Sequence, residues 1–225
     1  MDKIWTDSIE DYLKVVFELT SRGDRATTTR LAERLEVTPA SVTGMVQKLA
    51  ETDPPLLEYR KHHGVVLTDQ GRQVALQTIR HHRLIEMFLH QILGFSWDEV
   101  HEEAERLEHV ISENMEERIA SVLGHPTHDP HGDPIPTRDL EIPPSSGVRL
   151  SELRDGQRAI VQRVHDHDPA LLRHLYDLGL EPECEVRVLG YSQFDENLEL
   201  QVAGREDPAV LGPRVTQQVY VDIID

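Results

Sequence analysis

The stretch TTTRLAERLEVTPASVTGMVQKLA, residues 27–50, decides the fold of the N-terminal part of this 225-residue chain. Its apolar residues recur at the spacing of two amphipathic helices, with a tight turn at residues 36–37. Thr38 suits the N-cap of the second helix, and Pro39 suits its first position, where the missing N–H is no loss. Because residues 6–22 show a further amphipathic pattern, the sequence predicts three successive helices.

The segment after these helices predicts a β-hairpin, because residues 56–60 and 65–68 are rich in strand formers and flank a glycine-containing turn. Three helices followed by a hairpin are the layout of a winged helix-turn-helix, whose third helix enters the major groove of DNA while the wing touches the backbone. The small number of positive charges counts against DNA binding, and a protein-interaction module of the same layout is the alternative. The side chains predicted to contact DNA are those of Thr38, Pro39, Ser41, Thr43, Gln47, Lys48, Arg60 and Lys61.

A second informative stretch is HEEAERLEH, residues 101–109. Wound as a helix, it would place His101, Glu105, Glu108 and His109 on one face, at positions i, i+4, i+7 and i+8. Carboxylates that lie side by side repel each other, whereas a divalent cation between them would be coordinated. The pattern therefore indicates a metal site, with a solvated acidic helix surface as the alternative.

Another His/Glu pair supports a metal site. His82 and Glu86 are also i and i+4, in a segment over residues 68–93 that predicts a helix. A short turn leads to the next helix, expected to start with a capping box at Ser96, so the two helices can form an antiparallel hairpin with both faces turned inward. Apolar residues along 74–92 exceed what one hairpin covers. A symmetric homodimer would cover them, and burial under the N-terminal domain is the alternative.

Charge and cysteine content limit the function. The chain has a net charge of −18, distributed as −3 in residues 1–70, −8 in residues 71–147 and −7 in residues 148–225. An acidic protein binds nucleic acid poorly except through a local surface. A single cysteine, Cys184, excludes thiolate-rich metal sites, so any metal is held by oxygen and nitrogen. The N-terminus lacks signal-peptide character and no long apolar run exists, so we expect a cytoplasmic protein that does not enter a membrane.

The C-terminal half predicts a linker and a small β domain. Residues 125–147 are rich in Pro, Gly and Ser, and their histidines, His125, His128 and His131, could form a metal-binding tract. Solvated loop histidines are the reading we favour. From residue 148, short alternating runs surround one helix at residues 169–178 and predict an SH3-like β-barrel. The expected fold is mainly α with a small β part, in four pieces: residues 1–70, 71–124, 125–147 and 148–225.

These pieces in this order resemble the diphtheria toxin repressor family of metal-dependent transcription regulators. The resemblance covers essentially the whole chain and rests on residues 8–13, the recognition-helix region, residues 82–86, the H-x3-E-x2-E-H motif at 101–109, and GDPIP at 132–136. It implies a DNA-binding regulator that is not an enzyme, with two metal sites per subunit. The implied primary site uses Asp11, Glu105, Glu108 and His109, and the implied ancillary site uses His82, Glu86, His101 and Asp168, with His167 as a competitor for the last position.

The resemblance also bears on the metal. Iron-sensing members carry Met and Cys at the positions of Asp11 and Glu105, whereas the manganese-responsive branch carries carboxylates there, as this chain does. Hard oxygen ligands remove the preference for softer ions and suit Mn(II), with Fe(II) as the alternative. Two features depart from that branch: Lys14 stands where it has a Glu ligand, and the chain keeps a C-terminal barrel that many of its members lack.

The expected function is repression of metal-uptake genes, with Mn(II) as co-repressor of a homodimer bound to palindromic, double-stranded promoter DNA and with no small organic substrate. The metal would tie Asp11 of the DNA-binding domain to the dimerisation helices and so fix the spacing of the two reading heads. A di-metal hydrolase is the alternative from another class, since paired metal ions can activate water, but the winged helix would then have no role. A metal buffer, which the linker histidines would suit, is the third hypothesis.

Overall fold

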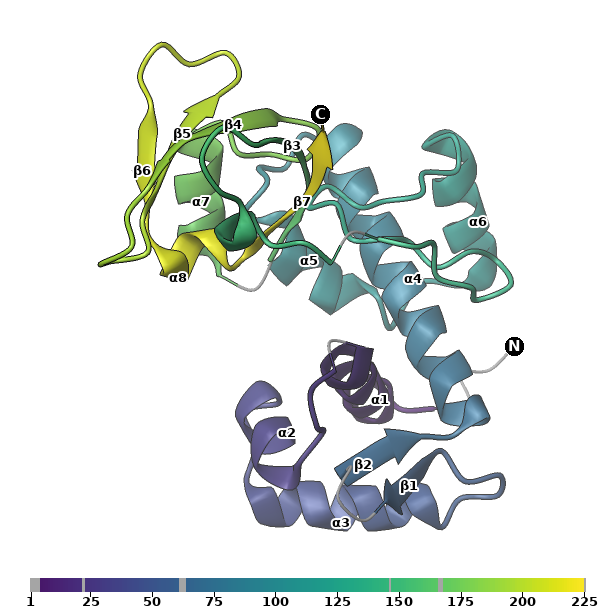
Figure 1. Ribbon diagram of the computed structural model, residues 1–225. Coiled ribbons are helices and arrows are strands. Elements are labelled where there is room, and N and C mark those ends of the chain that lie inside the picture. The colour runs from purple at the N-terminus through teal and green to yellow at the C-terminus, as the bar shows by residue number, and fades with distance from the viewer. Residues whose placement is uncertain (1–4, 22, 61–63, 146, 166–167, 225) are drawn as a thin grey trace. The chain divides into compact units, whose positions relative to one another are not determined.

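The computed structural model describes residues 5–21, 23–60, 64–145, 147–165 and 168–224 (Figure 1). The chain groups into two compact units, which alternate along the sequence: the first holds residues 1–82, 108–111 and 136–141, and the second holds residues 83–107, 112–135 and 142–225. The division falls inside the long helix α4 (Asp69–Gln91). It does not follow the expected domain limits at residues 70 and 124, which remain a prediction.

The first unit contains the predicted winged helix-turn-helix. Its elements are α1 (Asp7–Ser21), α2 (Thr28–Arg34), α3 (Pro39–Ala50), β1 (Leu57–Arg60), β2 (Gly64–Leu67) and the first part of α4. The two strands are antiparallel, with Leu57 opposite Leu67 and Arg60 opposite Gly64. Thr38 caps α3 as expected, because its hydroxyl accepts a hydrogen bond of 3.2 Å from the Ser41 N–H. The helices share a core that includes the fully buried Leu13, Val16, Leu31, Val42 and Leu49.

The second unit begins with helices and ends with a sheet. Its further elements are α5 (Val100–Leu107), α6 (Glu113–Val122), the 3-10 turn η1 (Leu150–Glu152), β3 (Arg158–Val164), α7 (Pro169–Asp177), β4 (Glu185–Tyr191), β5 (Leu198–Val202), β6 (Ala209–Leu211), α8 (Pro213–Thr216) and β7 (Val219–Ile224). The five strands form one antiparallel sheet in the order β6-β5-β4-β3-β7, coloured green to yellow in Figure 1. This confirms the small β part predicted from the alternating runs.

Trp97 joins the helical part of the second unit to the core of the sheet. Its side chain is buried among residues of the C-terminal half, with Leu150, Leu172 and Leu175 in the same apolar cluster. The indole N–H donates a hydrogen bond of 2.9 Å to the carbonyl oxygen of Pro130. A buried tryptophan usually finds such a partner for its one polar atom. The β part is therefore not a separately packed piece, because its core includes a side chain from the segment before α5.

Helix α5 is shorter than the sequence predicts. Ser96 does contact Glu99, since its backbone N–H donates to the Glu99 carboxylate over 3.3 Å, but residues 97–99 form a turn and α5 begins at Val100. At the other end, residues 108–110 form a turn after Leu107. The expectation of one continuous helical face from His101 to His109 is therefore wrong. Glu108 and His109 make polar contacts in the first unit, and such tertiary contacts outweigh the small helix propensity of single residues.

The segment rich in Pro and His has no regular helix or strand, as expected, but much of it is packed rather than solvated. His131 is 0% exposed, so the solvated reading is wrong for this histidine, while His125 and His128 are exposed. The chain passes close to β3 here: the N–H of Val164 donates to the carbonyl of His131 over 2.9 Å. Gly132 allows this approach, because its φ is +88° and a Cβ there would lie 1.9 Å from the Gln162 carbonyl oxygen.

The apolar surface along α4 is largely covered by the chain itself. Leu76, Ile79, Leu84, Ile85 and Leu89 are all buried, whereas Ile92, just beyond the end of α4, is 49% exposed. Most of the surface assigned to a dimer partner is thus used for internal packing. No helix in the described part of the chain has both the length and the apolar character needed to span a bilayer.

Candidate metal centre and DNA-binding surface

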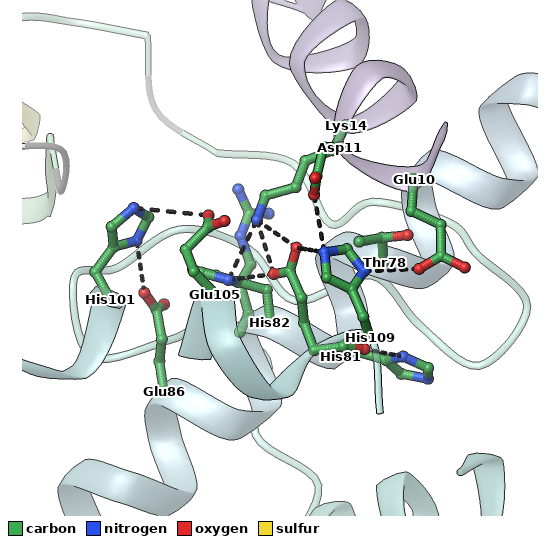
Figure 2. A network of polar contacts seen from close by, with 12 residues as sticks. Glu10, Asp11, Lys14, Thr78, His81, His82, Glu86, His101, Glu105 and His109 are labelled. Carbon is green, nitrogen blue, oxygen red and sulfur yellow. Dashed lines mark hydrogen bonds and ion pairs between the residues drawn. The ribbon is translucent and has the colours of Figure 1, made fainter. Parts of the chain in front are cut away.

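In the first unit, a cluster of ionisable side chains connects α1 with the turn after α5 (Figure 2). Glu10 and Asp11 are neighbours on α1, and each carboxylate contacts a different nitrogen of the His109 ring. Nε2 of His109 lies 2.8 Å from Oδ1 of Asp11, and Nδ1 lies 2.7 Å from Oε2 of Glu10. The imidazole is thus held between two anions that come from the first turns of α1.

These contacts control the proton on His109. Burial by itself would lower the pKa of His109, but hydrogen bonds to Asp11 and Glu10, together with the nearby Glu108 carboxylate, raise the pKa to about 10. Both ring nitrogens then carry protons at neutral pH and donate to the two carboxylates. A metal ion that bound either nitrogen would have to displace a proton, which couples metal affinity to pH.

Glu108 is the most buried member of the cluster, at 1% exposure. Its Oε2 lies 2.5 Å from Nδ1 of His82 and 2.7 Å from Nζ of Lys14, and its Oε1 lies 2.9 Å from the same Nζ. Its Oε1 is also 3.4 Å from Nε2 of His109. The carboxylate is therefore surrounded by groups that can carry positive charge, as a buried anion requires.

Three of the four residues implied for the primary site come together here. Asp11, Glu108 and His109 each offer a ligand atom, and these atoms lie within 4.8 Å of one another. Two carboxylates and an imidazole form an oxygen and nitrogen donor set that suits a divalent first-row metal ion. The fourth residue, Glu105, belongs to the second unit, where its Oε1 lies 3.8 Å from Nε2 of His101.

The second unit contains a different cluster around Glu86, which is fully buried on α4. Nδ1 of His101 donates to Oε1 of Glu86 over 3.2 Å. His131 donates from Nε2 to the Trp97 carbonyl over 2.9 Å. Its Nδ1 has no hydrogen-bond partner among the described residues and lies 3.9 Å from Oε2 of Glu86. A buried carboxylate oxygen beside a buried imidazole nitrogen favours a positive charge close to both.

Asp129 completes this second cluster. Its Oδ1 accepts hydrogen bonds of 2.9 Å from the N–H groups of both His131 and Asp133, and its Oδ2 lies 3.4 Å from Nε of Arg83. Glu86, Asp129 and His131 offer ligand atoms within 4.8 Å of one another, and all three residues are buried. The sequence analysis did not single out Asp129. The available signal was the run DPHGD, in which Asp and Gly promote a tight turn that folds the histidine inward.

The residues implied for the ancillary site belong to both units, so this ligand set stays a prediction. Glu86 and His101 lie together in the second unit, and His82 contacts Glu108 and Lys14 within the first unit. Asp168 caps α7, because its Oδ1 accepts from the N–H groups of Ala170 and Leu171 over 2.9 and 3.2 Å. Among the described residues it belongs to no group of candidate ligands. His167, the competitor for that position, lies outside the described residues.

The described residues among those predicted to contact DNA belong to α3, to its N-cap and to strand β1. Thr38, Pro39, Ser41, Thr43, Gln47, Lys48 and Arg60 are all exposed. Helix α3 contains no carboxylate, which is notable in so acidic a chain. Several of these side chains have intramolecular partners: the Thr38 and Ser41 hydroxyls lie 2.9 Å apart, Thr43 donates to the Pro39 carbonyl over 2.9 Å, and Nε of Arg60 donates to Glu58 over 3.0 Å. Lys61 lies outside the described residues.

A winged helix-turn-helix followed by buried His and carboxylate clusters defines a metal-responsive, DNA-binding regulator. Comparison with known families agrees with this class. The chain matches the iron dependent repressor N-terminal DNA binding domain at residues 5–65, the iron dependent repressor metal binding and dimerisation domain at residues 68–137, and the FeoA domain at residues 148–223. The chain belongs to the diphtheria toxin repressor family of iron-dependent repressors, and it is a metal-dependent transcriptional repressor.

Individual relatives include both iron and manganese regulators. The iron-dependent repressor IdeR of Mycobacterium tuberculosis (strain ATCC 25618 / H37Rv) is 37% identical over 194 residues, which cover 81% of this chain and 84% of the relative. The regulator MntR of Oceanobacillus iheyensis is 35% identical over 120 residues, or 53% of this chain and 80% of the relative. A solved manganese-dependent transcriptional repressor in complex with manganese is 37% identical, with a TM-score of 0.87 over 96% of this chain and 100% of that chain. These relatives are named as transcriptional repressors or regulators and not as enzymes, so the hydrolase hypothesis is abandoned.

Proposed function

We propose that this repressor responds to Mn(II), which binds two sites per subunit and enables a homodimer to bind palindromic promoter DNA of metal-uptake genes. The observation that carries the proposal is the cluster of Asp11, Glu108 and His109. It links a helix of the DNA-binding unit to a turn that follows almost one hundred residues later in the chain. Coordination by all three residues would fix α1 against that turn.

The donor atoms support manganese. Both candidate clusters consist of carboxylates and imidazoles, and the one thiol of the chain, Cys184, belongs to neither. An all-oxygen and nitrogen donor set removes the preference for thiophilic ions, and Mn(II) accepts such ligands readily. Fe(II) is the alternative, since relatives named as iron-dependent repressors are similar over most of the chain. When bound, the ion supplies two positive charges and bonds to its ligands.

The chain's own residues explain how such an ion would favour DNA binding. Leu13 and Val16 of α1 are fully buried in the core that also holds Val42 of α3, so the position of α1 constrains the recognition helix. The two recognition helices of a dimer must reach major grooves about one helical turn apart. If α1 is not fixed beforehand, it loses conformational entropy when DNA binds, and the affinity for DNA falls. Neutralising Asp11 and Glu108 also weakens the acidic field that repels DNA.

The cluster in the second unit is our candidate for the second metal site. Oε2 of Glu86 and Nδ1 of His131 lie 3.9 Å apart in a buried place, Asp129 offers a ligand atom within 4.8 Å of theirs, and His101 contacts Glu86. This differs from the ligand set implied by the resemblance, since Asp129 and His131 replace His82 and Asp168. Nδ1 of His131, buried without a hydrogen-bond partner among the described residues, is the feature that favours a cation here.

Exposed apolar side chains in the second unit support a homodimer. Ile92, Leu93, Met115 and Val122, which lie at the end of α4 and on α6, are between 45% and 64% exposed. Large apolar side chains exposed in numbers are typical of an interface with a partner. The matched family domain carries dimerisation in its description, which agrees with this use.

The proposal is tested by measuring binding of the full-length protein to the upstream region of its own gene while Mn(II), Fe(II), Co(II) or Zn(II) is titrated. We expect Mn(II) to activate binding reversibly, with loss on addition of chelator. Asp11→Asn should raise the Mn(II) concentration needed, while Asp24→Asn, on the surface of the same unit, should not. DNA affinity that ignores chelator would refute the co-repressor role, and activation by Fe(II) at lower concentrations than Mn(II) would favour the iron alternative.

A further inference from the structure

Lys14 is a buried lysine whose ammonium group lies inside the candidate metal centre of the first unit. It follows Asp11 by three residues on α1 and is 6% exposed. Its Nζ lies 2.7 and 2.9 Å from the two oxygens of Glu108 and 3.3 Å from Nδ1 of His82 (Figure 2). Lysine is almost never buried unless it is paired, and here the pair is with both oxygens of one carboxylate.

The ammonium uses the same atoms that a metal ion would need. A protonated lysine has three donors and no acceptor, so it cannot itself be a ligand. It occupies bonding positions on both Glu108 oxygens, and one of those oxygens lies 3.4 Å from Nε2 of His109. A divalent ion coordinated by Glu108 would therefore meet a like charge at close range, in surroundings where charges are poorly screened by water.

We infer that Lys14 is a tethered cation that competes with the activating metal for Glu108 and so sets the metal concentration at which the repressor switches. The inference rests on the proposed function, because it takes Asp11, Glu108 and His109 as the residues that hold the metal. In the metal-free protein, Lys14 neutralises a carboxylate that would otherwise be buried without compensation, and it keeps the turn at residues 108–110 in contact with α1.

Metal binding then exchanges one cation for another. The incoming ion gains Glu108, and Lys14 loses its contact with that carboxylate while remaining close to two new positive charges. The pair therefore stabilises the metal-free state and weakens metal binding, so the protein responds only when the metal is abundant. Removal of the Lys14 charge should lower the stability of the metal-free protein and raise its affinity for the metal. These opposite effects separate competition from a purely structural role.

The test compares Lys14→Met, which keeps an unbranched apolar stem without the charge, with Lys14→Arg, which keeps the charge. Calorimetric titration of Mn(II) into the full-length protein, without DNA, measures affinity, and thermal unfolding in chelator measures stability. We expect Lys14→Met to bind Mn(II) about 10- to 100-fold more tightly and to melt at a lower temperature when metal-free. Lys14→Arg should stay close to the wild type in both measurements.

An unchanged or weaker Mn(II) affinity in Lys14→Met would overturn the inference, and Lys14→Gln replaces that variant if it does not fold without metal. Asp11→Asn, titrated in parallel, separates the inference from the proposed function. If Asp11→Asn weakens binding but loss of the Lys14 charge does not strengthen it, the inference fails alone. If Asp11→Asn has no effect, the proposed metal centre fails and takes the inference with it.

Discussion

Replacing Gly132 by alanine tests whether the close packing of the His-rich segment on β3 is needed for stability. Gly132 has a φ of +88°, and an added Cβ would lie 1.9 Å from the Gln162 carbonyl oxygen and 2.8 Å from Cα of Arg163. The left-handed backbone of a residue with a Cβ costs roughly 1–2 kcal/mol. The contact is with backbone, which cannot rotate away, and such overpacking costs about 1–3 kcal/mol more. The free energy of unfolding should therefore fall by about 2–5 kcal/mol.

Gly124→Ala is the matched control, because Gly124 has a φ of +75° but nothing within 4 Å of the added Cβ. It should cost only the backbone component of roughly 1–2 kcal/mol. Urea denaturation of the metal-free protein, followed by the fluorescence of Trp97 in a Trp5→Phe background, measures both. Trp97 reports on this region because its ring centroid lies 5.3 Å from that of His131. Equal destabilisation by the two substitutions would refute the argument that β3 and the His-rich segment are in obligatory contact.

Four further outcomes are expected. The pKa of His109 is raised to about 10 from 6.5, so its contribution to the stability of the metal-free protein is complete below about pH 6.5 and is lost as the pH rises toward 10. His109→Gln should therefore be free of this loss of stability at high pH. Identical unfolding curves for the wild type and His109→Gln between pH 7 and 10 would contradict the contacts with Glu10 and Asp11. Glu105→Cys should move the metal preference toward softer ions in a titration series, and an unaltered order would argue against Glu105 as a ligand. Truncation after Gly147 removes the side chains that bury Trp97, so its emission should shift to the red; emission at the wild-type wavelength would show that the helical part covers Trp97 without the sheet. Lys48→Ala should weaken DNA binding similarly across sequences and reduce the salt slope by about one unit if Lys48 contacts a phosphate, whereas an unchanged slope would exclude that contact.

Local pattern predicted those parts of the fold that local physics determines. The caps and apolar periodicity of residues 27–50 predicted α2 and α3 to within a residue at each end, because the Thr38 cap and the Pro39 start act within one turn of helix. The hairpin of β1 and β2, and the run of short strands after residue 148, were likewise predicted from alternation and turn residues.

The candidate sites were predicted only in part. The spacing of the motif at residues 101–109 predicted which residue types would gather around a metal, but it assumed a helix that ends at Leu107 in the structure. The turn at residues 108–110 depends on Lys14 and Asp11, and no helical period relates α1 to a turn so far along the chain.

The sequence by itself determined the class of protein, because amphipathic periods, caps and the His and carboxylate spacing are read within one or two turns of chain. Only the tertiary structure decided that Lys14 pairs with Glu108 and that His131 is buried beside Glu86. Both outcomes depend on long-range packing, because each buried polar group lies next to a partner from a distant segment of the chain. Burying such a group without a partner costs free energy, and this cost favours the local conformation in which the partner is in contact.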